Sequence, residues 1–198
     1  DKQSFLISKW MGVGFVHGVM NTDNMLVSGE TIDYGPCAFM DEYNPSIYFS
    51  SIDKHGRYSY KNQPAIMIWN LSKLAEAFIP LVDKNKEKAV IELSEVLNLA
   101  MPTYQEYFYI EMSKKFGLKN VDQEVMNLVN NYLKILMENS VDFVLSFRDL
   151  GKLLSDNKKI DDTVFKNVKN FNSWYCEFLN ILSLKKLTKL KVSKKMDS

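Results

Sequence analysis

The chain has 198 residues, of which 46% are hydrophobic and 25% charged, a balance that suits a buried core rather than a disordered polypeptide. Lysine and arginine number 25 against 24 aspartate and glutamate residues, so the formal net charge is +1. The net charge therefore gives no reason to expect a nucleic acid or an anionic membrane as partner. No apolar run approaches the roughly 18 residues of a membrane-spanning helix, since the best candidate is the short stretch 65–69.

Cysteine and histidine are scarce, which excludes two kinds of metal site. Cys37 and Cys176 are the only cysteines, too few for a disulfide framework or a cysteine-rich zinc site. We expect both to be free thiols in a reducing, cytoplasmic compartment. His17 and His55 are the only histidines, so a zinc site with several histidine ligands is also excluded. The chain starts at Asp1 rather than Met and shows no signal peptide, and we expect it to be a piece of a longer protein.

The first third of the chain, residues 1–63, holds most of the glycines. Two short β-compatible pieces, 25–27 and 31–32, are separated by Ser28-Gly29-Glu30, a sequence typical of a turn. This pattern predicts a loop, a small β-hairpin and a second loop.

From residue 64 onwards, apolar residues recur with the spacing of amphipathic helices. The predicted helical stripes lie within 71–79, 90–100, 102–117, 122–136, 143–154 and 163–182. The first stripe consists of Leu71, Leu74, Ala75, Phe78 and Ile79, and the second of Val90, Leu93, Leu97 and Ala100. We expect both stripes to be buried.

Capping residues give the predicted ends of these helices. Pro102 suits the first turn of the third helix and Gly117 its end. Asp122 and Thr163 are candidate N-caps of the fourth and sixth helices. The lysine-rich stretch 185–195 is expected to be a solvated, frayed terminus. We therefore predict a mainly α fold in one domain, in which residues 1–63 carry any chemistry and residues 64–198 form a helical bundle.

Polar residues of the kind that bind metal and nucleotide gather on both sides of the predicted hairpin. Mg²⁺ prefers oxygen ligands, commonly one or two protein groups completed by phosphate oxygens and water. Asn24 and Asp33 flank the hairpin, which would bring them together as such a pair. Asp23 adds a carboxylate that can accept the proton of an attacking hydroxyl. Gly35 is expected to let the backbone turn sharply beyond Asp33.

Each of these residues also has a purely structural explanation. Asp23 and Asn24 can cap a loop, and Asp33 can open a turn. A lone histidine is more often a hydrogen-bonded packing residue than a catalyst, and we keep that interpretation for His17. Taken together, however, the order of His, Asn, hairpin and Asp-x-Gly is typical of the catalytic loop and metal loop of a kinase.

Val19 departs from the protein-kinase pattern. In the motif H-R-D-x-x-x-x-N, an Asp two residues after the His positions the substrate hydroxyl. Alignment on His17 and Asn24 places Val19 at that position, and a valine accepts neither a proton nor a hydrogen bond. Ordinary phosphoryl transfer by this loop is therefore not expected, although the metal ligands remain.

Several sequence blocks closely resemble the selenoprotein O family, also called the YdiU or UPF0061 family. The most specific are WMGVGFVHGVMNTDN at 10–24, TIDYGP at 31–36 and FMD at 39–41, with further matches at GRY, QP and WNL from 56 to 71. The likeness covers nearly the whole chain. It implies a protein kinase-like fold, of which this chain resembles the C-terminal lobe, with a short β-hairpin between the catalytic loop and the metal loop.

The resemblance also implies a reaction. Members of the family look like pseudokinases, yet they transfer AMP from ATP to Ser, Thr or Tyr hydroxyls of proteins. By this resemblance Asp23 is the proton acceptor, Asn24 and Asp33 bind Mg²⁺ or Mn²⁺, and Asp33 also contacts the nucleotide. His17 and Gly35 would support the site. The family's nucleotide-gripping lobe precedes the part matched here, so the chain alone is expected to be inactive.

Two other functions stay open. A small-molecule phosphotransferase of the aminoglycoside or choline kinase type shares the fold, but it keeps an Asp where Val19 stands. A non-catalytic pseudokinase scaffold would bind a partner through its helical face. Under the leading hypothesis the partners are ATP and protein substrates, with neither nucleic acid nor membrane, and the protein is cytoplasmic.

Overall fold

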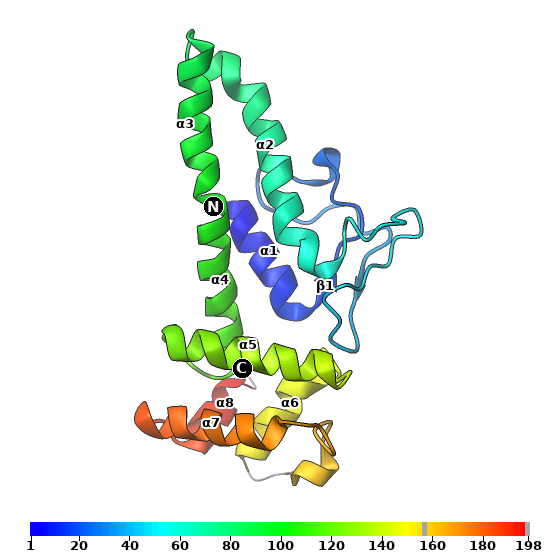
Figure 1. Cartoon of the computed structure of the whole chain (residues 1–198), viewed down its shortest axis with the longest axis vertical. Coiled ribbons are helices and arrows are strands. Elements are labelled where there is room, and N and C mark those ends of the chain that lie inside the picture. Colours follow the sequence, from blue (N-terminus) through cyan, green and yellow to red (C-terminus); the bar gives the residue numbers. More distant parts are fainter. Residues whose placement is uncertain (156–157, 197–198) are drawn as a thin grey trace. The chain divides into compact units, whose positions relative to one another are not determined.

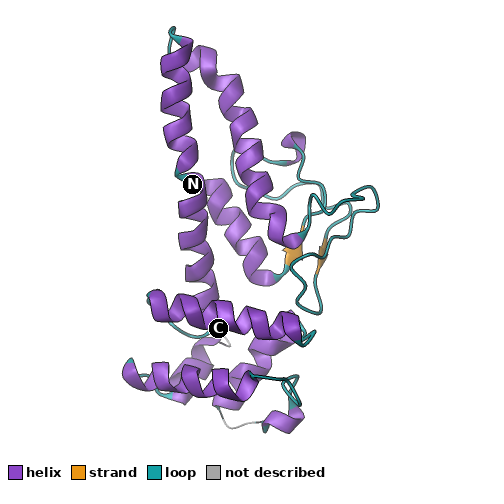
Figure 2. Cartoon of the chain, in the orientation of Figure 1, coloured by secondary structure: helices purple, strands orange, loops and turns teal. Residues whose placement is uncertain are grey.

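The computed structural model describes residues 1–155 and 158–196, and most of them are helical (Figures 1 and 2). The helices are α1 (Lys2–Val13), α2 (Gln63–Val82), α3 (Lys86–Asn98), α4 (Ala100–Lys115), α5 (Gln123–Glu138), α6 (Phe143–Leu154), α7 (Phe171–Leu184) and α8 (Lys189–Met196). Strands β1 (Phe15–Val16) and β2 (Ala38–Phe39) form one small antiparallel sheet. The 3₁₀ turns are η1 (Thr22–Asn24), η2 (Tyr60–Asn62) and η3 (Ile160–Asp162). The mainly α prediction is confirmed.

The chain divides into two compact units. The first consists of residues 1–39 and 46–108, and the second of residues 40–45 and 109–198. The organisation expected from the sequence, 1–63 followed by 64–198, stays a prediction, although its boundary coincides with the start of α2.

Helix α1 of the first unit lies in a region that the sequence predicted to be a loop. It ends at Gly14, whose φ of 72° is left-handed, and β1 follows at once. Its buried residues include Gln3, Ser4 and Ser8. Because polar residues occupy part of the buried face, the apolar periodicity that would have revealed the helix is weak.

The predicted hairpin is reduced to a single antiparallel bridge between Met25 and Thr31. The turn itself is as expected, since Gly29 donates its N–H to the carbonyl of Leu26 at 3.0 Å and has a φ of 81°. A Cβ on Gly29 would lie 2.8 Å from the Cβ of Lys2. The turn therefore packs directly against the start of α1, and only a glycine fits there.

The prediction that the α2 and α3 stripes are buried is wrong for several members. The buried residues of α2 all lie in its first half, from Gln63 to Asn70. Farther along, Leu74 is 37% exposed and Phe78 46%, and Val90 of α3 is 41% exposed. Helices α2 and α3 run alongside each other (Figure 1). Among the described residues, each of these two helices has apolar side chains that the other helix leaves exposed.

The segment Tyr60–Val82 is long and apolar enough, with a hydropathy of 1.4, to meet a length-and-composition test for a membrane-spanning helix. This does not contradict the absence of a long uninterrupted apolar run, because Asn70, Lys73 and Glu76 interrupt the segment. Only 17% of the 18-residue window that meets the test is buried. One such helix is weak evidence, because core helices and signal sequences meet the same test.

Aromatic side chains form the core of the second unit. Tyr132 of α5 lies with its ring centroid 4.5 Å from that of Trp174 and 5.1 Å from that of Phe116. The Trp174 indole N–H donates to the carbonyl of Leu128 at 2.9 Å, so its polar atom is satisfied in the core. Asp122 caps α5 as predicted, since its carboxylate accepts the N–H of Val125 at 2.9 Å.

Two predictions for the end of the chain are wrong. The sixth predicted helix starts at Phe171 rather than after Thr163, which instead follows η3. The lysine-rich stretch is not frayed, because it contains α8. Val192 of that helix is fully buried, and the Ser193 hydroxyl donates to the carbonyl of Gly151 at 2.8 Å. These contacts are long-range, so the local lysine pattern could not reveal them.

Candidate functional site

His17 lies at the centre of the predicted catalytic loop and is completely buried. Its Nε2 lies 2.7 Å from the carbonyl oxygen of Ile32, and its Nδ1 lies 3.4 Å from the backbone N–H of Val19. A carbonyl only accepts and an N–H only donates, so these partners fit the neutral ring with its proton on Nε2. The ring also stacks on Trp10, with centroids 5.2 Å apart. His17 is thus buried with a hydrogen bond at each ring nitrogen, the environment of the packing residue that the sequence interpretation describes.

Asn24 ends the short turn η1 that follows this loop. Its Nδ2 donates to the carbonyl of Val19 at 3.0 Å, and its backbone N–H donates to the carbonyl of Asn21 at 3.0 Å. Because the carbonyl of Val19 can only accept, the amide orientation is fixed. The Oδ1 of Asn24 is therefore the amide atom left for a cation.

Asp33 has a backbone φ of 54°, in the left-handed region that few residues other than glycine, Asn and Asp adopt. Its Oδ1 accepts the N–H of Gly35 at 3.3 Å. Gly35 is not among the glycines with positive φ, so the sharp turn that the sequence assigned to Gly35 is made by Asp33 itself. A Cβ on Gly35 would lie 3.2 Å from the Oδ1 of Asp33. Gly35 thus gives the carboxylate room.

Two contacts hold the Asn24 and Asp33 segments together. The first is the bridge between Met25 and Thr31, and the second is the hydrogen bond from His17 to Ile32. Asn24 precedes the bridge on one strand and Asp33 follows it on the other, so the antiparallel pairing leaves both at the same end. The two residues that the sequence proposed as metal ligands therefore flank one bridge.

Asp23 lies in η1, next to Asn24, and its side chain is exposed. The Met25–Thr31 bridge is isolated, and Asp23 lies in the 3₁₀ turn two residues before it. Its carboxylate is therefore open to solvent, one residue before Asn24.

Across residues 1–155 and 158–196, no three His, Cys, Asp or Glu side chains lie close enough to hold a metal by themselves. Asn24 and Asp33 together offer fewer donors than such a group, namely one amide oxygen and one carboxylate. It suits Mg²⁺, which keeps several waters and takes oxygens from substrate phosphates. It does not suit zinc, which takes Cys and His ligands in a closed tetrahedral site. Both cysteines are free, as the sequence predicted.

Sequence reasoning missed the side chains that fix the loop from behind. Gln63 of α2 is fully buried; it accepts the N–H of His17 at 3.0 Å and donates to the carbonyl of Phe15 at 2.9 Å. Asn70, two turns later on the same helix, donates to the carbonyl of Met20 at 2.9 Å. The signal that could have found them is an amide side chain at either end of the apolar stretch 64–69, which precedes the first predicted helical stripe.

A second loop approaches the catalytic loop from residues 53–58. The Asp53 carboxylate accepts the backbone N–H groups of Arg57 and Tyr58 at 2.9 and 2.8 Å, which folds this loop. The Tyr58 hydroxyl then donates to the Oδ1 of Asn21 at 2.5 Å. The guanidinium of Arg57 lies 4.8 Å from the ring centroid of Trp69.

The whole of this site lies within a stretch of the chain that matches a known protein family. The family described as "Protein adenylyltransferase SelO" matches residues 1–197, and the match includes the whole of the loop, the bridge and Asp33. The chain belongs to the SelO family.

Curated relatives of this SelO-family chain carry the name "Protein nucleotidyltransferase YdiU". The protein from Rhizobium rhizogenes is 45% identical over 88% of this chain and 35% of its own length. The protein from Maridesulfovibrio salexigens is 46% identical over 87% of this chain and 35% of its own length. The protein from Methylorubrum populi is 48% identical over 76% of this chain and 30% of its own length. The chain thus spans 30–35% of the length of these relatives.

Proposed function

We propose that this chain is the catalytic-loop portion of a protein adenylyltransferase that transfers AMP from ATP to Ser, Thr or Tyr hydroxyls of proteins. The observation that carries the proposal is the placement of Asn24 and Asp33 at one end of the Met25–Thr31 bridge, with Val19 where a kinase has its Asp. The family match and the nucleotidyltransferase names of the relatives support it. They favour a transferase that acts on a nucleotide over a scaffold without chemistry.

In the proposed reaction the substrate hydroxyl attacks the α-phosphorus of ATP. The new bond joins the hydroxyl oxygen to that phosphorus, and the bond to the bridging oxygen breaks, so pyrophosphate leaves. The hydroxyl proton passes to the carboxylate of Asp23, which is exposed beside the metal ligands. Val19 cannot take this proton, which is why we assign it to Asp23.

A divalent cation, Mg²⁺ or Mn²⁺, would be held by the Oδ1 of Asn24 and the carboxylate of Asp33. It would neutralise the phosphate charge that develops as pyrophosphate leaves. Both side chains are already oriented by the protein, Asn24 through the carbonyl of Val19 and Asp33 through the N–H of Gly35. In this proposal Asp33 also contacts the nucleotide, His17 positions the loop, and Gly35 leaves space for the carboxylate.

The same proposal includes a protein kinase-like C-terminal lobe. A long helix, α1, leads into the His17 loop, a reduced hairpin follows, and a buried amide from α2 fixes the loop. The order of His17, Asn24 and Asp33 along this segment is the one that the kinase motifs have. The lobe that grips the phosphates would lie in the rest of the longer protein, as would the other determinants of substrate choice.

The test is the transfer of label by the full-length protein that contains these residues. Incubated with Mg²⁺ and a mixture of acceptor proteins, it should attach label from [α-³²P]ATP and none from [γ-³²P]ATP. Attachment from the γ position alone would identify a phosphotransferase and overturn the proposal. Absence of any labelling, with no Mg·ATP binding, would favour the scaffold. The 198-residue chain alone is expected to label nothing.

A further inference from the structure

The loop that carries Arg57 is held in a fixed shape by hydrogen bonds within it. Asp53, which is 7% exposed, accepts the backbone N–H groups of Arg57 and Tyr58 at 2.9 and 2.8 Å. The Asn62 side chain donates to the carbonyl of Gly56 at 2.8 Å, and Gly56 has a φ of 64°. Because these contacts fix the backbone on both sides of Arg57, the direction in which its side chain starts is fixed as well.

The guanidinium of Arg57 lies against aromatic rings at the surface. Its Cζ is 4.8 Å from the ring centroid of Trp69 and 5.7 Å from that of Tyr58, distances at which a ring attracts a cation. The ring of Tyr48 packs against Gly56, where a Cβ would lie 3.4 Å from its Cδ1. Tyr48 and Trp69 are 43% and 42% exposed. We refer to Tyr48, Arg57, Tyr58 and Trp69 as the Arg57 surface.

The exposed charge of this loop is positive. Segment 46–63 contains Lys54, Arg57 and Lys61, all exposed, against a single acid, Asp53. Both carboxylate oxygens of that buried acid accept N–H groups of the loop itself. In the part of the chain that the structure describes, no carboxylate pairs with Arg57. The Arg57 surface therefore offers a positive charge that an outside anion can neutralise.

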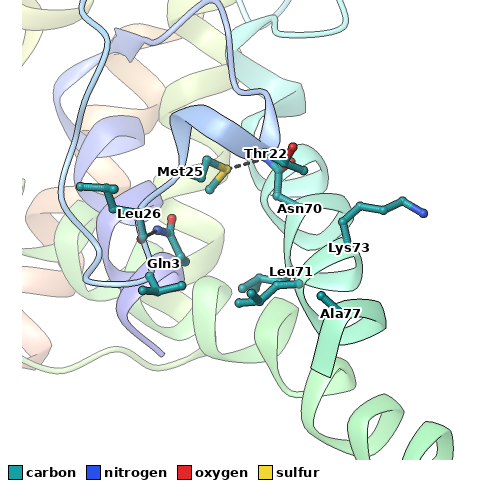
Figure 3. Close-up of a pocket in the computed structure, with 10 residues that line it drawn as sticks. Gln3, Thr22, Met25, Leu26, Asn70, Leu71, Lys73 and Ala77 are labelled. Atoms are coloured by element: carbon teal, nitrogen blue, oxygen red, sulfur yellow. Dashed lines mark hydrogen bonds between the residues drawn. The ribbon is translucent and has the colours of Figure 1, made fainter. Parts of the chain in front are cut away.

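Lys73 is a second cation near Trp69, but it has a partner. Its Nζ lies 5.7 Å from the Trp69 ring centroid and pairs with Glu76 at 2.7 Å. Figure 3 shows its side chain pointing away from Thr22 and Met25. Of the two cations over Trp69, Arg57 is thus the one available to an outside anion.

The Arg57 surface adjoins the predicted catalytic loop. The Tyr58 hydroxyl donates to the Oδ1 of Asn21 at 2.5 Å. Asn70, the residue after Trp69, approaches the same loop from α2 (Figure 3). Asn21 precedes Asp23 by two positions, so the Cα atoms of these two residues are at most about 7.6 Å apart. A molecule bound to the Arg57 surface would therefore lie beside the loop that holds the proposed proton acceptor.

The composition of the Arg57 surface indicates a protein partner rather than a small anion. Tyr, Trp and Arg are the side chains most enriched at the positions that dominate the binding energy of protein interfaces. A phosphate group would need only the guanidinium, whereas Tyr48 and Trp69 add exposed aromatic area that a protein segment can cover. The charge then favours a segment with carboxylates, because a guanidinium binds a carboxylate through two parallel hydrogen bonds.

We propose that the Arg57 surface binds an acidic segment of the acceptor protein, with a Glu or Asp carboxylate on the Arg57 guanidinium. This inference rests on the proposed function for the identity of its partner. An extended peptide spans about 3.3 Å per residue, so the acidic residue lies a few positions from the acceptor hydroxyl. The surface thus selects hydroxyls that have acidic neighbours.

Binding can be tested on the 198-residue chain without any catalysis. The chain is prepared with fluorotryptophan, and Trp69 reports a ligand at this surface because Trp10 and Trp174 are buried. The ¹⁹F signal that Trp69→Phe lacks is that of Trp69. A peptide with glutamates around one serine should shift this signal saturably and leave the other two in place. The same peptide with glutamines should bind at least roughly tenfold more weakly, and equal binding would overturn the proposal.

Arg57→Gln removes the charge and keeps a polar side chain at an exposed position. It should weaken binding of the glutamate peptide roughly tenfold and leave that of the glutamine peptide unaffected. Arg148→Gln makes the same change at the other arginine of the chain, exposed on α6, and should alter neither. The melting temperature of Arg57→Gln checks that the variant is folded. Unchanged binding of the glutamate peptide by a folded Arg57→Gln chain would overturn the proposal.

The phosphates of ATP are the other anions that Arg57 could bind under the proposed function. The full-length protein separates the two, because KM is measured for each substrate. Arg57→Gln should raise KM for the glutamate peptide roughly tenfold and leave KM for ATP unchanged. A rise in KM for ATP alone would assign Arg57 to the nucleotide and overturn the proposal.

The same measurements separate this surface from the proposed function. AMP transfer with equal KM for the glutamate and glutamine peptides would overturn the surface while leaving the proposed function intact. If no peptide is adenylylated but the glutamate peptide still binds through Arg57, the proposed function fails and the Arg57 surface stands as a site for acidic peptides.

Discussion

The side chain of Gln63 joins helix α2 to the backbone of His17, accepting its N–H at 3.0 Å. The same side chain donates to the carbonyl of Phe15 at 2.9 Å. One buried amide therefore satisfies two backbone groups on either side of Val16. Since Asn24 and Asp33 are both tied to the His17 loop, the position of the proposed metal ligands depends on this contact.

Replacing Gln63 with Leu should destabilise the protein, because it leaves a buried N–H and a buried carbonyl without partners. We expect the free energy of unfolding to fall by about 2–5 kcal/mol, measured by urea denaturation. Gln123→Leu, on the exposed surface of α5, is the matched control and should change it by less than about 0.5 kcal/mol. Similar values for the two variants would show that the contact with His17 is unimportant.

The proton acceptor can be tested separately from the metal ligands. In the full-length protein, Asp23→Asn should lower kcat for AMP transfer by roughly 10²–10⁴-fold, because it removes the general base but keeps the size of the side chain. Binding of Mg·ATP should persist. Asp161→Asn, an exposed acid in η3, should leave the rate unchanged. A fully active Asp23→Asn variant would assign the proton to another group.

The left-handed backbone of Asp33 decides which substitution is informative there. Asn tolerates a positive φ, so Asp33→Asn should change the free energy of unfolding by less than about 0.5 kcal/mol while removing the carboxylate. Asp33→Ala should cost about 1–2 kcal/mol, because alanine pays the steric penalty of that conformation. Thermal denaturation of both variants checks the difference. Equal stabilities would mean that φ at this residue relaxes easily.

Both Asp33 variants should abolish Mg²⁺-dependent AMP transfer by the full-length protein. Only Asp33→Asn attributes that loss to the carboxylate rather than to local strain. Activity that survives in Asp33→Asn would exclude Asp33 as a necessary metal ligand.

Gly117, in the second unit, is a position where an added side chain would clash. Its φ is 65°, and a Cβ there would lie 2.7 Å from the carbonyl oxygen of Val192 in α8. We expect Gly117→Ala to cost about 2–4 kcal/mol, from backbone strain together with displacement of α8. Denaturant unfolding measures the loss, and faster amide exchange in α8 would locate it. A neutral substitution would mean that α8 is not held against this turn.

Burial raises the pKa of Tyr43 to about 12, and it raises the pKa of Tyr132 as well. Above the unfolded value of 10, the unfolded chain loses the Tyr43 proton while the folded chain keeps it. The contribution of Tyr43 to the free energy of unfolding is therefore fully present below pH 10 and is lost as the pH rises towards 12. Between pH 9 and pH 11 the free energy of unfolding of the unsubstituted chain should fall by about 1.4 kcal/mol more than that of the Tyr43→Phe variant. Urea unfolding at the two pH values tests this, and identical losses would contradict it.

The sequence by itself determined which groups are available for chemistry. The spacing of His17, Val19 and Asn24, followed by Asp33, indicated a kinase-type metal loop without the kinase base, because these residues are close along the chain. Strong local signals succeeded for the same reason. Asp122 caps α5 through a carboxylate three residues from the N–H it accepts, and such a contact needs no tertiary partner.

Only the tertiary structure decided how those groups are held. Gln63 accepts the N–H of His17, which lies 46 positions away in the sequence. Gly117 lies against Val192 of α8, which is also far away along the chain. Burial likewise depends on what covers a helix face. For this reason the α2 stripe is apolar but Phe78 is exposed, while Val192 is buried within a lysine-rich segment that local composition marks as solvated. Periodicity records what a helix can bury, whereas packing partners distant in sequence determine what it does bury.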